Sequence, residues 1–185
     1  IILEPSSQNT APAITAAALK AISSWNDPIL LILPSDHQIT NDEIFLDSIE
    51  KAKHAAIEGN IVTFGIKPSN PATGFGYIKS KSPFKANFSG PYKIDSFIEK
   101  PNKELAEKFY QDKQYSWNSG IFMFRASVIL NEISKNSPLV FESCKNAVAG
   151  SSEDLDFLRI KNNEFKKSPN ISIDIAVMEK TNLGT

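Results

Sequence analysis

Short runs of β-forming residues alternate with helical patterns along this chain, and no other property restricts its fold as strongly. The continuous apolar run 29–33, for example, ends at Pro34 and precedes a helical pattern that Asn41 or Asp42 caps and that runs to about Ala56. Such alternation is typical of α/β proteins with a parallel sheet. An unbroken apolar strand is typical of burial on both faces. We therefore predict an α/β protein with a mixed, mostly parallel central sheet flanked by helices.

The same patterns predict the remaining elements. Strands are expected at 1–3, 61–66, from Tyr77, 92–99, 120–125 and 171–173. Helices are expected at 12–24, 102–110, 128 onward, 138–149 and 154–159, with a short one around Val177. Thr10 and Asn102 are the expected caps of two helices, and Gly59 is expected to end a third. Prolines and glycines predict a loop at 67–76.

Length and composition bound the class of protein. The 185 residues suit one domain, 1–185, because the connector Gly150–Ser152 is too short to separate two. A net charge of -1 provides no basic field for nucleic acid. The single cysteine, Cys144, excludes an internal disulfide and favours a cytoplasmic setting, and we expect it to be a packing residue. No apolar run approaches the length of a membrane span. Because the chain opens without methionine, we interpret it as an internal piece of a longer protein.

The run Phe97–Pro101 places an acid and a base at the exit of a strand, where open α/β sheets bind ligands. The carboxylate of Glu99 can accept hydrogen bonds from hydroxyl groups, and the ammonium of Lys100 can meet a phosphate. The pair therefore suits a ligand that carries both groups. An exposed Glu–Lys turn without a ligand is the alternative interpretation.

Two aspartates follow predicted strands and are candidate metal ligands. Asp36 comes after the buried run 29–33, and Asp174 ends the run 171–173. A carboxylate in this position suits Mg²⁺, which keeps waters and borrows oxygens from substrate phosphates. A turn residue for Asp36 and a helix cap for Asp174 are the alternatives.

Two further segments contain candidate substrate-binding residues. Gly74 and Gly76 flank an aromatic residue ahead of a strand, so the backbone there could approach a ligand closely, although a hairpin turn is an equal alternative. Asn118 precedes another strand, and its carboxamide carries both donors and acceptors that suit a sugar hydroxyl. A turn in which Asn118 fixes its own backbone is the alternative.

The segment between the first strand and the first helix carries polar groups that could read a purine or hold an anion. These candidates are Glu4, Pro5, Asn9 and Thr10. Simple N-capping is the alternative interpretation. No serine or cysteine has a convincing partner among the two histidines, so we find no nucleophile system.

Taken in order, these segments resemble the mannose-1-phosphate guanylyltransferase family of sugar nucleotidyltransferases. The resemblance spans nearly the whole chain, and its specificity comes from the ordered set of motifs. The matching segments are 2–5, 9–14, 33–37, 63–66, 68–78, 97–101, 117–125, 172–174 and 176–181.

The resemblance implies a Rossmann-like nucleotide-diphospho-sugar transferase fold that uses GTP, mannose 1-phosphate and Mg²⁺ to form GDP-mannose for polysaccharide biosynthesis. By this likeness Asp36 and Asp174 would hold Mg²⁺, and Lys100 would meet the sugar phosphate. Glu99 and Asn118 would bind mannose hydroxyls beside the Gly76 backbone. The candidates of the first loop would lie along the guanosine. A homodimer is also expected, and some relatives carry a downstream mannose-6-phosphate isomerase domain.

Two departures from the family pattern matter. The family usually has arginine where this chain has Gln8, which weakens the expected contacts to phosphate or base. The family's glycine-rich loop, which wraps the triphosphate, would lie upstream of Ile1. We therefore expect the chain as given to bind poorly and not to turn over. The same chemistry on another sugar or base, and a non-catalytic sugar-nucleotide sensor, are the alternative functions.

Overall fold

The computed structural model describes residues 1–85 and 90–185, which form two compact units. Unit 1 comprises Ile1–Pro28 and Arg125–Thr181, and unit 2 comprises Ile29–Phe124 and Asn182–Thr185. Each unit therefore joins segments that are far apart in the chain. None of the helices among the described residues has the length and apolarity needed to cross a bilayer.

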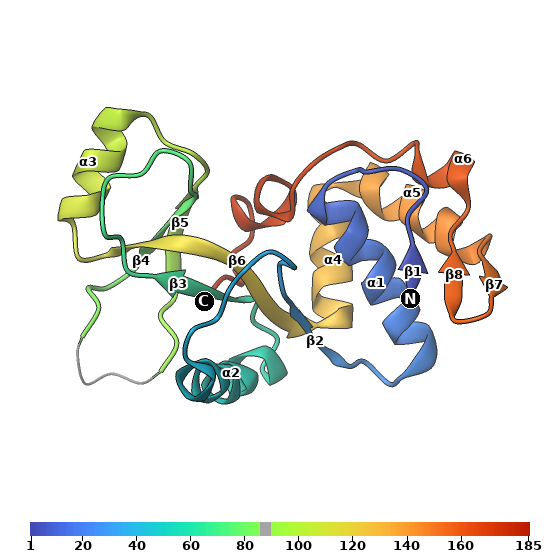
Figure 1. The fold of residues 1–185 in the computed structure, drawn as a ribbon, viewed down its shortest axis with the longest axis horizontal. Helices are drawn as coiled ribbons and strands as arrows, with labels where there is room; N and C mark the ends of the chain where they lie inside the picture. The colour runs from blue at the N-terminus through green and yellow to red at the C-terminus, as the bar shows by residue number, and fades with distance from the viewer. Residues whose placement is uncertain (86–89) are drawn as a thin grey trace. The chain divides into compact units, whose positions relative to one another are not determined.

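Unit 1 is built on three helices that pack together: α1 (Thr10–Ser24), α4 (Ala126–Asn136) and α5 (Pro138–Ala149) (Figure 1). Fully buried alanines on all three helices allow this close packing: Ala11, Ala18, Ala126 and Ala147. The helix α6 (Asn162–Phe165) and a π-helical turn, η1 (Asp174–Met178), complete its helical part.

Unit 1 also contains a small sheet. Its strand order is β1 (Ile2–Leu3), β8 (Phe157–Arg159) and β7 (Ser152–Asp154). The pair β1–β8 is parallel and the pair β7–β8 is antiparallel. The first strand of the chain is thus held by a hairpin from its second half.

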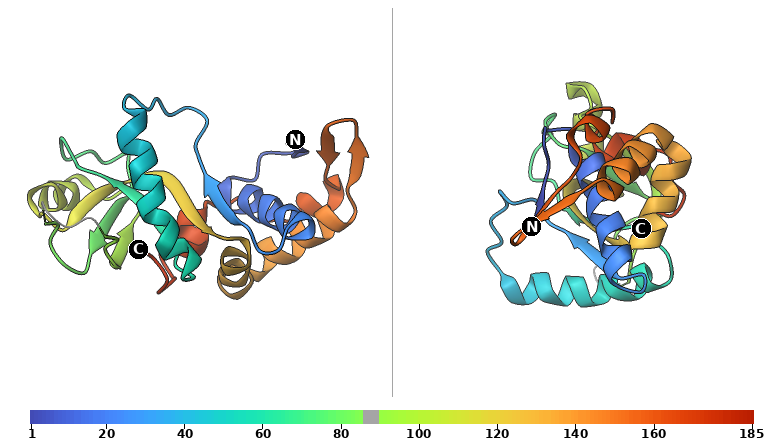
Figure 2. Two further views of the ribbon diagram at one scale, coloured as in Figure 1. Left: turned by 90° about the horizontal axis from the view of Figure 1, so that it is seen from below. Right: turned by 90° about the vertical axis from the view of Figure 1, so that its right-hand side faces the viewer.

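Unit 2 is built on a five-stranded sheet. The strand order is β2 (Ile29–Ile32), β6 (Tyr115–Arg125), β4 (Tyr77–Ser80) and β5 (Ile94–Ile98), and β3 (Val62–Ile66) also pairs with β6. The helix α2 (Asp42–Ile57) lies across β3 and β6 (Figure 2). Its residues Ala52, Ala55 and Ala56 pack against Val62 and Met123. The helix α3 (Lys103–Gln111) stacks Phe109 on Tyr115 of β6, with ring centroids 4.2 Å apart.

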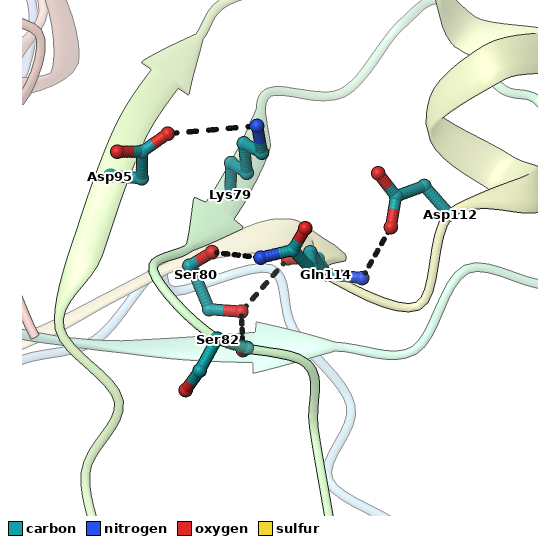
Figure 3. Close-up of polar contacts among 6 residues, drawn as sticks. All are labelled: Lys79, Ser80, Ser82, Asp95, Asp112 and Gln114. Atoms are coloured by element: carbon teal, nitrogen blue, oxygen red, sulfur yellow. Dashed lines mark hydrogen bonds and ion pairs between the residues drawn. The ribbon is translucent and has the colours of Figure 1, made fainter.

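Hydrogen bonds connect the turn between α3 and β6 to β4 (Figure 3). The side-chain amide of Gln114 donates to the carbonyl oxygen of Ser80 at 3.0 Å, and the Ser80 hydroxyl lies 3.1 Å from the carbonyl oxygen of Gln114. The backbone N–H of Gln114 donates to Asp112 at 2.9 Å. An ion pair of 3.7 Å between Lys79 and Asp95 joins β4 to β5. These contacts position the start of β6, the strand that carries Asn118.

The α/β class with a sheet flanked by helices is confirmed, and several element boundaries agree with the prediction. Helix α2 is capped by Asn41, whose side chain accepts from Ile44 N, and it is followed by Gly59 with φ 87°. Helix α3 is capped by Asn102, as predicted. The cap of α1 is Asn9 rather than Thr10.

The pairing directions differ from the expected parallel pattern. The pairs β3–β6, β4–β6 and β4–β5 are antiparallel. Since β5 and β6 both run antiparallel to β4, they are parallel to each other, with α3 as the crossover between them. The alternation of strand, helix and strand therefore exists here, but β4 is inserted between the two parallel strands. In addition, all four residues of β2 are only half-buried, and Leu33 is exposed.

Two predicted elements are wrong. The segment 154–159 is not a helix but part of the β7–β8 hairpin, because β8 pairs with β1 at the other end of the chain. The segment 171–173 is not a strand. It pairs with the start of α1, where Ile171 N donates to Gln8 O at 3.3 Å and Ala11 N donates to Ile171 O at 3.2 Å.

Candidate functional site

The turn after β5 presents Glu99 and Lys100 together. Lys100 Nζ lies 3.2 Å from Glu99 Oε1, and the side chain of Lys100 is 65% exposed whereas that of Glu99 is 23% exposed. Lys100 has φ 46°, the left-handed region that non-glycine residues adopt at a cost. Such strained positions cluster at ligand sites. The predicted acid–base pair thus exists, with the carboxylate sheltered and the ammonium in solvent.

Gly76 brings the backbone against the Glu99 carboxylate. A Cβ added at Gly76 would lie 2.6 Å from Glu99 Oε2 and 3.3 Å from the ring of Phe97. Both distances are shorter than ordinary carbon contacts, so a side chain at this position would force the Glu99 carboxylate to move. A Cβ on Gly74 would meet nothing within 4 Å. The close approach that the sequence suggested for two glycines therefore belongs to Gly76.

Asn118 lies at an irregularity of β6 and contacts three neighbours. Its backbone N–H donates to Gly76 O at 2.8 Å. Its side-chain oxygen Oδ1 accepts from the Thr63 hydroxyl at 3.1 Å and from Gly120 N–H at 3.2 Å. The register between β3 and β6 shifts here, and Gly120 has φ 72°. The turn that Asn118 fixes, which was the alternative interpretation, is therefore present. Asn118 also contacts Gly76, which in turn lies against Glu99.

Asp36 lies in the loop after β2 and is exposed, as is His37. The same loop passes the irregularity of β6, because a Cβ on Gly120 would lie 3.5 Å from the side chain of Pro34. All five residues Asp36, Gly76, Glu99, Lys100 and Asn118 belong to unit 2. Among the described residues, no group of three or more His, Cys, Asp or Glu side chains could hold a metal ion.

Unit 1 holds the other predicted residues, and the start of α1 meets the segment before Asp174. Asn9 caps α1 with its side-chain oxygen on Thr10 N at 2.9 Å, and its side-chain amide donates to Asn170 at 3.3 Å. The hydroxyl oxygen of Thr10 accepts from Ile173 N at 2.9 Å. Asp174 then opens η1 and does not end a strand. The capping interpretation thus applies to Asn9. The Thr10 hydroxyl joins the start of α1 to the segment before Asp174.

Glu4 and Pro5 lie in the exposed loop between β1 and α1. The residue as a whole is exposed, but partial desolvation of the Glu4 carboxyl raises its pKa. Burial, and then the nearby charge of Glu4, raises the pKa of the Cys144 thiol to about 12. Cys144 is fully buried, and its Sγ lies 3.6 Å from Pro12 O. A neutral buried thiol agrees with the packing role predicted for it.

Thr63 is not among the predicted site residues, although it opens the matching segment 63–66. A threonine within a strand is ordinary, so its residue type did not mark it as part of a site. Thr63 also lines a cavity of about 750 Å³ in unit 2, together with Gly65 and Ser116. None of the predicted site residues lines this cavity, although Thr63 connects it to Asn118.

Comparison with known proteins identifies the class of this chain. The family described as nucleotidyl transferase matches residues 1–163, so the chain belongs to the nucleotidyl transferase family. The mannose-1-phosphate guanylyltransferase of Klebsiella pneumoniae is 45% identical over 181 residues, which cover 98% of this chain. A Vibrio cholerae serotype O1 protein, 47% identical over 184 residues and 100% of this chain, carries the same name provisionally. The resemblance noted in the sequence is thereby confirmed.

Solved structures agree with this assignment. A mannose-6-phosphate isomerase from Helicobacter pylori has a TM-score of 0.88 at 32% identity, covering 99% of this chain and 70% of that one. A Thermus thermophilus protein described as a mannose-1-phosphate geranyltransferase has a TM-score of 0.81 at 30% identity, covering 98% of this chain and 50% of that one. The chain spans 38% to 39% of the length of the two curated relatives.

Proposed function

We propose that the protein to which this chain belongs transfers GMP from GTP to mannose 1-phosphate, giving GDP-mannose and pyrophosphate. The observation that carries the proposal is the set formed in unit 2 by Gly76, Glu99, Lys100 and Asn118. This set combines hydroxyl-binding groups with a cation for phosphate. Relatives at 45% and 47% identity, named as mannose-1-phosphate guanylyltransferases, support the same assignment.

The proposed chemistry is a direct displacement at the α-phosphorus of GTP. A phosphate oxygen of mannose 1-phosphate forms the new bond to that phosphorus. The bond from the α-phosphorus to the bridging oxygen of the β-phosphate breaks, and pyrophosphate leaves with the electron pair. No covalent enzyme intermediate is needed, because the attacking oxygen is already ionised. The protein therefore acts by aligning the reactants and offsetting their charges.

The residues of unit 2 would bind the sugar phosphate. Glu99 would accept hydrogen bonds from mannose hydroxyls, and its low exposure strengthens such bonds. Lys100 would reduce the repulsion between the two anionic reactants, and its exposed ammonium is accessible to a phosphate. In unit 1, the loop that contains Glu4, Pro5, Asn9 and Thr10 would lie along the guanosine.

We propose Mg²⁺ as the cofactor, with the carboxylates of Asp36, in unit 2, and of Asp174, in unit 1, each as a candidate protein ligand. Oxygen donors are the ligands that Mg²⁺ prefers, and few protein ligands suffice because it keeps waters. Bound Mg²⁺ would neutralise charge on the triphosphate. A cytoplasmic location and a homodimer accompany this proposal as predictions.

The proposal is tested with the full-length protein, supplied with GTP, mannose 1-phosphate and Mg²⁺. We expect GDP-mannose and pyrophosphate in equal amounts, and slower turnover with other sugar phosphates or other nucleoside triphosphates. Asp36→Asn should lower the rate sharply, whereas Asp42→Asn, a change on the exposed first turn of α2, should not. Binding of GDP-mannose without any turnover would favour the sensor alternative. An unchanged rate in Asp36→Asn would remove Asp36 from the metal site.

A further inference from the structure

Asn9 holds a backbone conformation that is nearly exclusive to glycine. Its φ is 73° and its ψ is -174°. A residue with a side chain is strained there, and such a conformation persists only where its surroundings enforce it. Glycine at the start of a helix would avoid this strain and would cap almost as well. The strain at this position therefore indicates that the asparagine side chain has a use besides capping.

The backbone on both sides of this strained residue is held by residues 170–173, which we call the clamp segment. On one side, Gln8 O accepts from Ile171 N at 3.3 Å. On the other side, the hydroxyl oxygen of Thr10 accepts from Ile173 N at 2.9 Å. Ile173 is 1% exposed, so the clamp segment is anchored in the core of unit 1. The start of α1 is thus fixed by a segment that lies 163 residues further along the chain.

Two contacts orient the side-chain amide of Asn9. Thr10 N–H donates to its Oδ1 at 2.9 Å, and a backbone N–H selects the oxygen because it can only donate. The nitrogen Nδ2 donates to Asn170 Oδ1 at 3.3 Å. An amide nitrogen carries two hydrogens, and within residues 1–85 and 90–185 Nδ2 has no second acceptor. Because Asn9 is exposed, its second N–H can be presented to an acceptor outside the protein.

We infer that Asn170 is a positioning residue, which fixes the Asn9 amide so that its second N–H meets an acceptor atom of the guanosine. This inference rests on the proposed function, in which the loop that contains Asn9 lies along the guanosine. Asn170 itself need not touch the nucleotide. A long hydrogen bond between two exposed side chains contributes little to stability. The role of Asn170 therefore concerns the affinity for guanosine and not the folding of unit 1.

Binding of guanosine to the full-length enzyme tests this role, with equilibrium dialysis of the labelled nucleoside as the measurement. Asn170→Ala removes the acceptor and should raise the Kd of guanosine about fivefold, the scale of one hydrogen bond. Asn170→Asp keeps an acceptor oxygen and should restore the wild-type Kd. Guanosine is the probe because it is uncharged, so the new carboxylate does not repel it. Asn131→Ala is the matched control, because it changes an exposed asparagine of α4, and it should leave the Kd unchanged.

Two further measurements separate positioning from a general loss of structure. Asn170→Ala should leave Tm unchanged, since the lost bond is exposed, and it should leave KM for mannose 1-phosphate unchanged, since the sugar-phosphate set belongs to unit 2. Asn9→Gly removes both the strain and the amide. We expect its Tm to stay near the wild-type value, because relief of strain offsets the lost cap, while the Kd of guanosine rises about fivefold.

Several results would overturn the inference. They are an unchanged Kd in Asn170→Ala, no restoration by Asn170→Asp, an equal rise in KM for mannose 1-phosphate, and a wild-type enzyme that does not bind guanosine. Failure of the proposed function is a different result. In that case guanosine binds and Asn170→Ala weakens its binding, but the wild-type enzyme forms no GDP-mannose.

Discussion

At Gly76, the absence of a single Cβ allows the Glu99 carboxylate to lie against the backbone. The sequence indicated each residue of this pair as a candidate, but it could not show that they touch. The same holds for Asn118, whose residue type suggested both donors and acceptors, whereas its side-chain oxygen already accepts from Thr63 and Gly120. The role of a polar side chain therefore depends on which of its atoms the protein already uses.

Gly76→Ala should disturb the sugar-phosphate site. The new Cβ would come within 2.6 Å of Glu99 Oε2 and displace that carboxylate. We expect KM for mannose 1-phosphate to rise about tenfold, the usual scale of such overpacking. Steady-state kinetics of the full-length enzyme measure the change. Gly74→Ala is the control, because open space surrounds its Cβ. Equal effects of the two changes would contradict the role of Gly76.

At the scale of elements, local signals were reliable where they concern neighbouring residues. The sequence predicted Asn102 as a cap and Asn41 as one of two candidates beside Asp42, because a capping side chain bonds to an N–H three residues ahead. The helix predicted at 154–159 failed because β1, remote in the chain, recruits that segment as a strand. In this segment, pairing with β1 outweighed the helical preference of the local sequence.

Asn102→Ala should destabilise α3 and the turn that carries Glu99 and Lys100. The side chain of Asn102 accepts from Leu105 N at 2.9 Å, and losing such a cap costs about 1 kcal/mol. Denaturant unfolding, monitored by circular dichroism, gives the change in the free energy of unfolding. Asn102→Asp retains a capping oxygen and should be nearly neutral. If Asn102→Asp lowered the free energy of unfolding as much as Asn102→Ala, capping would be excluded as the cause.

At the scale of the whole molecule, the predicted residues divide between the two units. Glu4, Asn9, Thr10 and Asp174 belong to unit 1, and the sugar-phosphate set belongs to unit 2. Because each unit joins distant segments, the chain order of the motifs does not reveal this division. The assignment of one substrate to each unit stays a prediction.

A matched pair of substitutions tests that assignment in the full-length enzyme. Glu4→Gln should raise KM for GTP and leave KM for mannose 1-phosphate unchanged. Glu99→Gln should do the reverse, because it weakens a charged acceptor of sugar hydroxyls. Each expected increase is about tenfold, the scale of a hydrogen bond to a charged group. Parallel changes in both constants for either variant would reject the division of substrates between the units.

The amino-acid sequence alone was enough to establish the α/β class, the Asn102 cap, the Glu99–Lys100 pair and the family, since these depend on residues close together in the chain or on ordered motifs. The folded chain was needed for the insertion of β4 between β5 and β6, the contact of Gly76 with Glu99, and the bond from Thr63 to Asn118. Those features depend on residues far apart in the chain, and packing free energy summed over many such contacts selects them. No local pattern of residues encodes that sum.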